Sequence, residues 1–215
     1  MARRRILIWG VPALFYLVFV GWYTDFGGPL RADEIDRYVG LLEAQGGPPE
    51  NLARIRHFME SDSGRQFLML NVVDYAESPP DVPGAAPGES ATQLMNRYME
   101  HMYAELFKRA CHPTIMGDAV HDAIDLVGVE TLESAGRWDM GAFFRYRSRR
   151  TFMEIVTIPE TSGRHEFKVA ALDKTIAYPV ETQLYLGDPR VLLGFVLLST
   201  AALADVAFGG RARSR

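Results

Sequence analysis

Two long runs of hydrophobic residues lie near the ends of the chain. The first covers residues 6–23 and has no charged side chain, and the second covers residues 191–208 and has one, Asp205. A helix of this length spans about 27 Å, close to the hydrocarbon thickness of a bilayer. We therefore predict transmembrane helices within residues 1–24 and 188–215, with the lipid bilayer as a partner.

Each of these two runs has an alternative interpretation. Arg3, Arg4 and Arg5 would suit a cleaved signal peptide, but the first run exceeds the usual length of about 7–15 residues and ends in Gly-Trp-Tyr. The second run could be a buried core helix, but its length, terminal position and arginine-rich flank argue against that. Asp205 could be a functional acid within the bilayer, but we favour an interfacial acid near Arg211.

Arginines flank both runs on their outer sides, and the second set is Arg211, Arg213 and Arg215. Because positive residues near spans stay in the cytoplasm, we expect both termini there, with the main domain periplasmic or otherwise extracytoplasmic at the inner (cytoplasmic) membrane. The net charge is −4 although both tails are basic, so the exported segment is acidic and nucleic acid is disfavoured as a partner. A single cysteine excludes a disulfide framework.

Residues 25–63 are expected to form a linker and two short helices. Asp33 is the predicted N-cap of the first helix, and apolar residues at helical spacing follow it. Pro48 and Pro49 open the second helix.

Residues 64–187 are predicted to form the main domain. The apolar run at 67–73 indicates a strand, and the loop at 78–90 is rich in proline and glycine. A helix is expected at 91–110, strands at 114–127 and 140–146, helical segments from Ser148 to Leu172, and a last strand at 175–186. This βαββαβ order predicts an α+β, ferredoxin-like domain between the transmembrane helices. One sheet face would be bare, and a second copy is its simplest cover, so a homodimer is expected.

Several motifs between residues 64 and 180 resemble the small, uncharacterised branch of the dimeric α+β-barrel superfamily, which is related to antibiotic-biosynthesis monooxygenases. The matching residues are Leu68-Met69-Leu70-Asn71, Tyr98, Trp138-Asp139, Arg145-Tyr146, Ser148-Arg149, Phe152, Pro159-Glu160, Ala170-Ala171-Leu172 and Thr175. The resemblance implies a ferredoxin-like fold and a dimer. The wider superfamily includes haem-degrading, haem-dependent and cofactor-free enzymes.

The chain also departs from the pattern of that branch. Arg147 stands where proline is usual, Phe167-Lys168 stands where His-Arg is usual, and His165 is displaced by two positions. Thr161 follows the Pro-Glu pair where tyrosine is frequent. If the cavity of that family depends on the His-Arg pair, the resemblance implies that this protein lacks the function of that pair.

Two features could bind a ligand. Asn71 is a polar residue in an apolar strand, so its amide must bond either to a ligand or to neighbouring backbone, which we favour. The run 145–150 holds four arginines, of which Arg145, Arg147 and Arg149 would share a strand face and could hold an anion. We favour the alternative to an anion site, in which these arginines pair with carboxylates of the protein itself or of a dimer partner.

No catalytic or metal-binding constellation is predicted. His121 and Asp125 would lie about 13 Å apart along a strand, and the adjacent Asp122 would point the other way. Cys111 and His112 are neighbours that do not face each other on a helix. No cofactor is predicted.

Two functional hypotheses follow. The first is a membrane-anchored structural or accessory subunit, either a homodimer or part of a larger membrane complex. The second is a ligand-binding protein or a monooxygenase-like or haem-related enzyme with a cavity between sheet and helices. Its tentative lining residues are Asn71, Tyr98, Trp138, Arg145 and Arg149.

Overall fold

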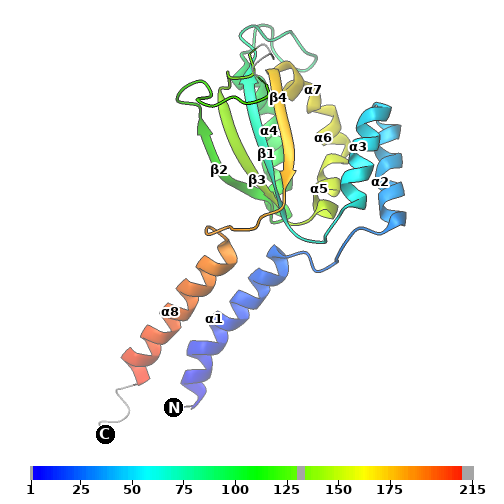
Figure 1. Cartoon of the computed structure of the whole chain (residues 1–215). Coiled ribbons are helices and arrows are strands. Elements are labelled where there is room, and N and C mark those ends of the chain that lie inside the picture. Colours follow the sequence, from blue (N-terminus) through cyan, green and yellow to red (C-terminus); the bar gives the residue numbers. More distant parts are fainter. Residues whose placement is uncertain (1, 130–133, 210–215) are drawn as a thin grey trace. The chain divides into compact units, whose positions relative to one another are not determined.

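The computed structural model describes residues 2–129 and 134–209 (Figure 1). The chain divides into two compact units. One consists of Met1–Asp25 with Gln183–Arg215, and the other of Phe26–Thr182. Each unit is described below by itself.

The first unit contains the two long apolar helices, α1 (Ala2–Tyr23) and α8 (Pro189–Gly209). The stretches Arg3–Tyr23 and Pro189–Phe208 are long and apolar enough to cross a membrane, and nearly all of their residues point outward rather than into the protein. Outward hydrophobic side chains suit lipid and not water. The two helices are therefore consistent with the predicted spans.

The two apolar helices contact each other through small and charged side chains. Arg5 of α1 binds Asp205 of α8 through two hydrogen bonds of 3.0 Å each. Gly194 lets the helices approach, since a Cβ atom there would lie 3.3 Å from the ring of Tyr16. The partner of Asp205 among the described residues is thus Arg5 on the other helix, and the interfacial position expected for Asp205 stays a prediction. Arg211, Arg213 and Arg215 lie outside the described residues.

The second unit is built on a four-stranded antiparallel sheet, which confirms the α+β class. The strands are β1 (Phe67–Tyr75), β2 (His112–Asp118), β3 (Met140–Tyr146) and β4 (Leu172–Val180), and their order is β2-β3-β1-β4. In β1, Asn71 lies opposite Ala142 of β3 and Ala177 of β4. Because directly opposed residues point to the same side, this register fixes which side chains share a sheet face.

Helices cover one face of this sheet (Figure 1). They are α4 (Ala91–Lys108), α5 (Arg149–Val156), α6 (Pro159–Gly163) and α7 (His165–Ala170). The core between sheet and helices contains the buried residues Phe67, Met102, Leu106, Cys111, Ala142, Phe144, Tyr146 and Ile155. Burial of these side chains drives the packing of the two layers.

A helical hairpin of α2 (Ala32–Ala44) and α3 (Pro49–Glu60) precedes the sheet. It has its own buried cluster, which includes Ile35, Tyr38 and Met59 together with Met153 of α5. Arg150 of α5 binds the Glu34 carboxylate at 2.9 Å and 3.1 Å. The hairpin therefore packs on the helical layer.

Three boundaries predicted from sequence are wrong. The first helix begins at Ala32 with Arg31 as its N-cap, so Asp33 lies in the first turn. The strand predicted at 114–127 ends at Asp118, because Val120 and Ile124 are almost fully exposed and gain nothing from strand pairing. The last strand is β4, which starts at Leu172 and ends at Val180, earlier than predicted at both ends.

Candidate functional site

Asn71 points to the helix-covered side of the sheet. It shares that side with Met69 and Ala142. Its side-chain Nδ2 donates to the backbone oxygen of Met69 at 3.2 Å. The amide thus bonds to neighbouring backbone, which is the alternative that the sequence favoured, and a ligand role for Asn71 stays a prediction.

Tyr98 lies on α4 and packs against the core between sheet and helices. Burial raises its pKa to about 12. Its ring has two polar neighbours on α7. The His165 ring stands edge-on with a centroid distance of 6.2 Å, and Lys168 Nζ lies 5.9 Å from the ring centroid. Within the described chain, the Tyr98 hydroxyl makes no hydrogen bond.

Lys168 is a half-buried cation whose pKa is lowered by burial. It forms no ion pair or hydrogen bond with any residue that the structure describes. The surrounding protein, and then the charge of Lys168, lower the pKa of His165, although this residue keeps much of its surface exposed. Both residues are held against α4, because Arg164 donates to the Arg97 backbone oxygen at 3.1 Å.

Tyr146, the last residue of β3, faces the same interior. It is 6% exposed, stacks on Phe67 at 5.3 Å and meets the edge of Phe152 at 5.1 Å. Burial raises its pKa, and the nearby charges of ionised Tyr98 and Cys111 raise it further. Its hydroxyl also lacks a hydrogen-bond partner among the described residues. The sequence places Tyr146 in a predicted strand and in the Arg145-Tyr146 motif, and it gives no sign of this unbonded hydroxyl.

Trp138 lies away from these residues, before the start of β3. Its Nε1 donates to the Ala135 backbone oxygen at 2.9 Å, and Lys174 Nζ lies 4.3 Å from its ring centroid. Arg145 lies seven positions after Trp138, which is about 23 Å of extended chain. The structure therefore does not bring Trp138 and Arg145 together.

Arg145 and Arg149 are engaged by the protein itself. Arg145 is fully buried, and it donates to Gln66 Oε1 at 2.8 Å and to the Ala110 backbone oxygen at 2.7 Å. The register places it with Leu68, on the sheet face opposite Asn71. The expected shared strand face fails for Arg149, because this residue begins α5.

Arg149 instead anchors the end of α3. It donates to Ser61 Oγ at 2.7 Å and to the Phe58 backbone oxygen, and it lies 3.6 Å from Asp62 Oδ1. Its guanidinium also lies 4.7 Å from the centroid of the Phe58 ring. Arg149 thus ties the helical hairpin to α5.

The remaining candidates show no shared site. Within residues 2–129 and 134–209, no group of three or more metal-ligating side chains comes together. Cys111 is buried, and burial raises its thiol pKa to about 11. His121 lies in the exposed connection after β2, and His112 lies in β2 itself.

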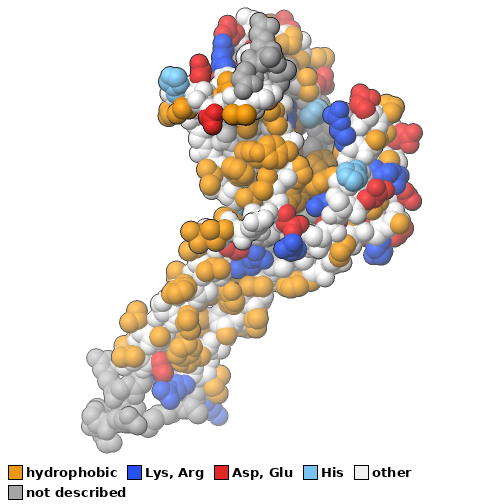
Figure 2. All heavy atoms as spheres, in the orientation of Figure 1, with side chains coloured by type: hydrophobic (Ala, Val, Ile, Leu, Met, Phe, Trp, Pro, Cys, Tyr) orange, Lys and Arg blue, Asp and Glu red, His pale blue; other side chains and the backbone are white. Residues whose placement is uncertain are grey.

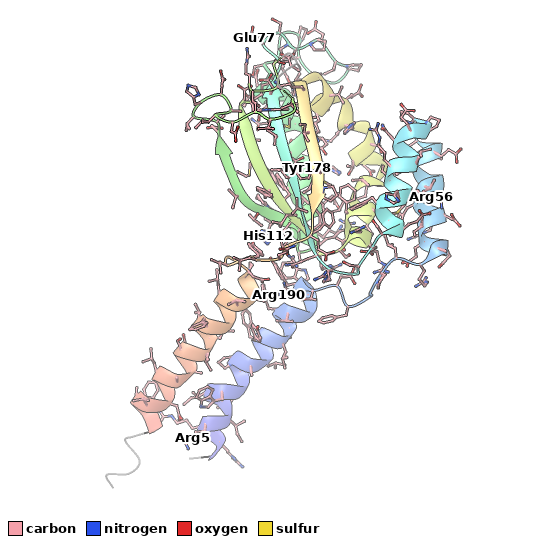
Figure 3. All side chains as sticks on the ribbon, viewed as in Figure 1. Arg5, Arg56, Glu77, His112, Tyr178 and Arg190 are labelled. Atoms are coloured by element: carbon pink, nitrogen blue, oxygen red, sulfur yellow. The ribbon has the colours of Figure 1, made fainter. Side chains whose placement is uncertain are left out.

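The sheet face opposite the helices carries a patch of apolar side chains (Figure 2). We call it the open face and define it by Leu70, Val72, Ile115, Phe143, Ile176 and Tyr178, which the strand register places on one side. Ile115 is 68% exposed, and Ile176 and Tyr178 are each 48% exposed. Tyr178 lies on β4, which is an edge strand of the sheet (Figure 3).

No protein-family model matches this chain, and no curated protein matches it. Its fold is similar to the crystal structure of RPA0582, a protein of unknown function from Rhodopseudomonas palustris, with 16% identity and a TM-score of 0.50 over 64% of this chain and 95% of that one. A structure of the methylated RPA0582 protein is similar to the same extent, with 17% identity and a TM-score of 0.51 over 66% of this chain and 95% of that one. At this identity the likeness concerns the fold alone.

Proposed function

We propose that this protein is a membrane-anchored structural subunit that assembles with a second copy through its open face. The observation that carries the proposal is the exposure of Ile115, Ile176 and Tyr178 on a sheet whose other face is covered by helices. Contiguous apolar surface of this kind marks interaction sites.

A second copy is the occupant that the surface favours. Sheets pack face to face when their strand directions lie within about 30° of each other, and two identical apolar faces fulfil this in a two-fold dimer. The resemblance of residues 64–180 to the dimeric α+β-barrel superfamily supports the same arrangement. A homodimer therefore covers the face without another protein.

The proposal includes a ferredoxin-like βαββαβ topology for the sheet unit. The antiparallel order β2-β3-β1-β4 supports it, as does the chain path, with α4 after β1 and three helices between β3 and β4.

The proposal also places the sheet unit outside the cytoplasm, with both termini inside. Two spans bring both chain ends to one side, and the arginines at both ends mark that side as cytoplasmic. A cysteine at the fully exposed Val120, in a Cys111→Ala background, is expected to react with a membrane-impermeant maleimide in intact cells. Labelling only after cell lysis would overturn the orientation.

The dimer is tested by measuring the mass of the full chain in mild detergent with light scattering. Wild-type protein should have the mass of a dimer, and the double variant Ile115→Lys/Tyr178→Lys should be a monomer, because it buries two charges in the contact. Val169→Lys is the matched control, since Val169 is 60% exposed on α7 in the helical layer and should leave the dimer intact.

A monomeric wild-type protein would contradict the proposal, and so would a double variant that stays dimeric. If the wild-type monomer instead joined a larger membrane complex, the open face would belong to another protein.

A further inference from the structure

The segment 183–188, just before α8, belongs to the unit of the two apolar helices and not to the sheet unit. It contains a turn, in which the Asp188 backbone N–H donates to the Tyr185 backbone oxygen at 3.3 Å. Two leucines point away from the protein here, since Leu184 is 77% exposed and Leu186 is 80% exposed. Large apolar side chains on a turn are stabilised when an apolar partner covers them. The position of this turn next to the helices identifies that partner.

The end of α1 and the start of α8 lie side by side. Arg190 Nη1 donates to Thr24 Oγ1 at 3.1 Å, and its guanidinium lies 5.5 Å from the centroid of the Tyr23 ring (Figure 3). The apolar stretch of α8, Pro189–Phe208, has 20 residues. At 1.5 Å per residue this is about 30 Å, which matches the hydrocarbon thickness of a bilayer. We therefore expect the two helices to leave the hydrocarbon region near Tyr23 and Pro189.

Leu186 lies close to this boundary. It is three positions before Pro189, so even a fully extended chain would place it within about 11 Å of the first residue of α8. The headgroup layer on each side of the hydrocarbon region is about 5–8 Å thick, and the turn shortens the distance further. Trp22 is 46% exposed in the last turn of α1, and tryptophan is enriched at this depth of a membrane. Leu184 and Leu186 are thus within reach of the lipid headgroups.

Asp188 offsets the positive charge of Arg190 at the end of this turn. Its carboxylate accepts hydrogen bonds from Arg190 Nη2 at 2.6 Å and from Nε at 3.0 Å, and the residue is only 8% exposed. Attraction to anionic headgroups comes from basic side chains whose charge is not compensated. The turn therefore favours an apolar contact with lipid, without selectivity for anionic headgroups.

We propose that the turn at 183–188 is a membrane-binding element, which inserts Leu184 and Leu186 between phospholipids at the boundary of headgroups and hydrocarbon. The contact holds the start of α8 at a fixed depth, as apolar side chains do in the interface of a bilayer. The inference rests on the proposed membrane anchoring and adds a lipid contact that two spans alone do not require. It does not depend on the open face.

The test uses the full chain with Cys111→Ala and Leu186→Cys in phosphatidylcholine nanodiscs, with a nitrobenzoxadiazole fluorophore on the new cysteine. Nitroxide lipids quench the fluorophore from the shallow 5-doxyl position or the deep 12-doxyl position. We expect at least about 2-fold stronger quenching by the shallow lipid than by the deep one. Replacing a third of the phosphatidylcholine by phosphatidylglycerol should leave this ratio unchanged. A ratio that rises with phosphatidylglycerol would contradict the apolar contact.

Two labelled positions are the controls. Leu198→Cys, at a position that is 59% exposed near the middle of α8, should be quenched more by the deep lipid, and Val120→Cys in the sheet unit should be quenched by iodide in the water. Quenching of Leu198→Cys by neither lipid would contradict the membrane anchoring itself, and this inference with it. If Leu198→Cys is quenched by lipid and Leu186→Cys is not, only the present inference falls. Shielding of Leu186→Cys from both iodide and the nitroxide lipids would mean that a protein, such as a second copy, covers the turn.

A second measurement tests whether the turn fixes the depth of α8. A fluorophore at Val191→Cys, in the first turn of α8 where the side chain is 58% exposed, reports that depth. The double variant Leu184→Gln/Leu186→Gln should make this fluorophore at least about 2-fold more sensitive to iodide, because the apolar contact is lost. Leu184→Ile/Leu186→Ile is the matched control and should leave it unchanged. Equal iodide quenching in the glutamine variant and the unsubstituted turn would overturn the proposed depth control.

Discussion

Arg5 and Asp205 lie 200 residues apart in the chain, yet they form a two-pronged ion pair between α1 and α8 with both N–O distances at 3.0 Å. An unpaired charge near the apolar part of a bilayer is costly, and each of these residues supplies the other's counter-charge. The pair thus joins the two apolar helices at the chain's terminal ends and fixes their relative register.

This pairing gives a first prediction. Asp205→Ala and Arg5→Ala should each destabilise the helix pair, and the double variant should lose less stability than the sum of the two single losses. Unfolding of the detergent-solubilised chain by SDS measures all four forms. Arg3 makes no ion pair with any described residue, so Arg3→Ala combined with Asp205→Ala should be additive. Additivity for Arg5 as well would show that the ion pair contributes nothing.

The local pattern of apolar residues was sufficient to predict those helices and strands in which buried positions recur at a regular spacing. The charge-free run before Tyr23, the apolar run from Phe67 and the four-residue repeat through Tyr98 each correspond to one element. The same reasoning failed at Val120 and Ile124, because apolar residues suggested a strand where the chain leaves both side chains in solvent.

Partners distant in sequence could not be predicted in this way. Arg5 is 200 positions from Asp205 in the sequence, and only the packing of α1 against α8 brings the two side chains together. Tyr98 meets Lys168 because α7 packs on α4, and periodicity within either helix carries no information about that contact. The candidate residues Trp138, Arg145 and Arg149 therefore lie in separate parts of the domain. The contact of Lys168 with Tyr98 is visible only in the packed structure.

Cys111 provides a probe of core opening. The thiol is fully buried, and burial raises its pKa to about 11, so little reactive thiolate is present near neutral pH. Ellman's reagent should react at least about 100-fold more slowly with the native chain than with chain unfolded in guanidinium. Cysteine introduced at Val120 is the exposed control and should react quickly in both states. Fast native labelling of Cys111 would mean that the core around β2 opens readily.

Two serine caps allow a comparison of burial. Ser148 Oγ accepts from the Thr151 backbone N–H at 3.0 Å at the start of α5, and the residue is 1% exposed. Ser90 Oγ accepts from the Gln93 N–H at 3.3 Å at the start of α4, but the residue is exposed.

Ser148→Ala should destabilise the sheet unit by about 1–2 kcal/mol, because no water can replace the lost acceptor. Ser90→Ala should cost less, about 0.5–1 kcal/mol. Thermal unfolding of both variants in detergent measures the difference. Equal losses would show that burial of the Ser148 cap is energetically unimportant.

The contact between Glu34 and Arg150 should make stability depend on acidity. Hydrogen bonding to Arg150, and then to the Arg31 backbone N–H, lowers the pKa of Glu34 from 4.5 to about 2, although partial burial opposes this. A carboxyl group with a lowered pKa in the folded state stabilises the fold above its unfolded pKa and loses that contribution as the pH falls. The loss should thus occur between pH 4.5 and about 2. Allowing for solvent screening, it should amount to about 1–2 kcal/mol.

Glu34→Gln should remove this acid-dependent loss and lower stability at neutral pH by a similar amount. Urea unfolding of the full chain in detergent, repeated from pH 7 down to about pH 2, measures both effects. Glu43→Gln is the matched control, because Glu43 is exposed near the end of α2 and forms no ion pair with a described residue. Parallel pH profiles for wild type and Glu34→Gln would show that the Glu34–Arg150 contact does not hold the α2–α3 hairpin against α5.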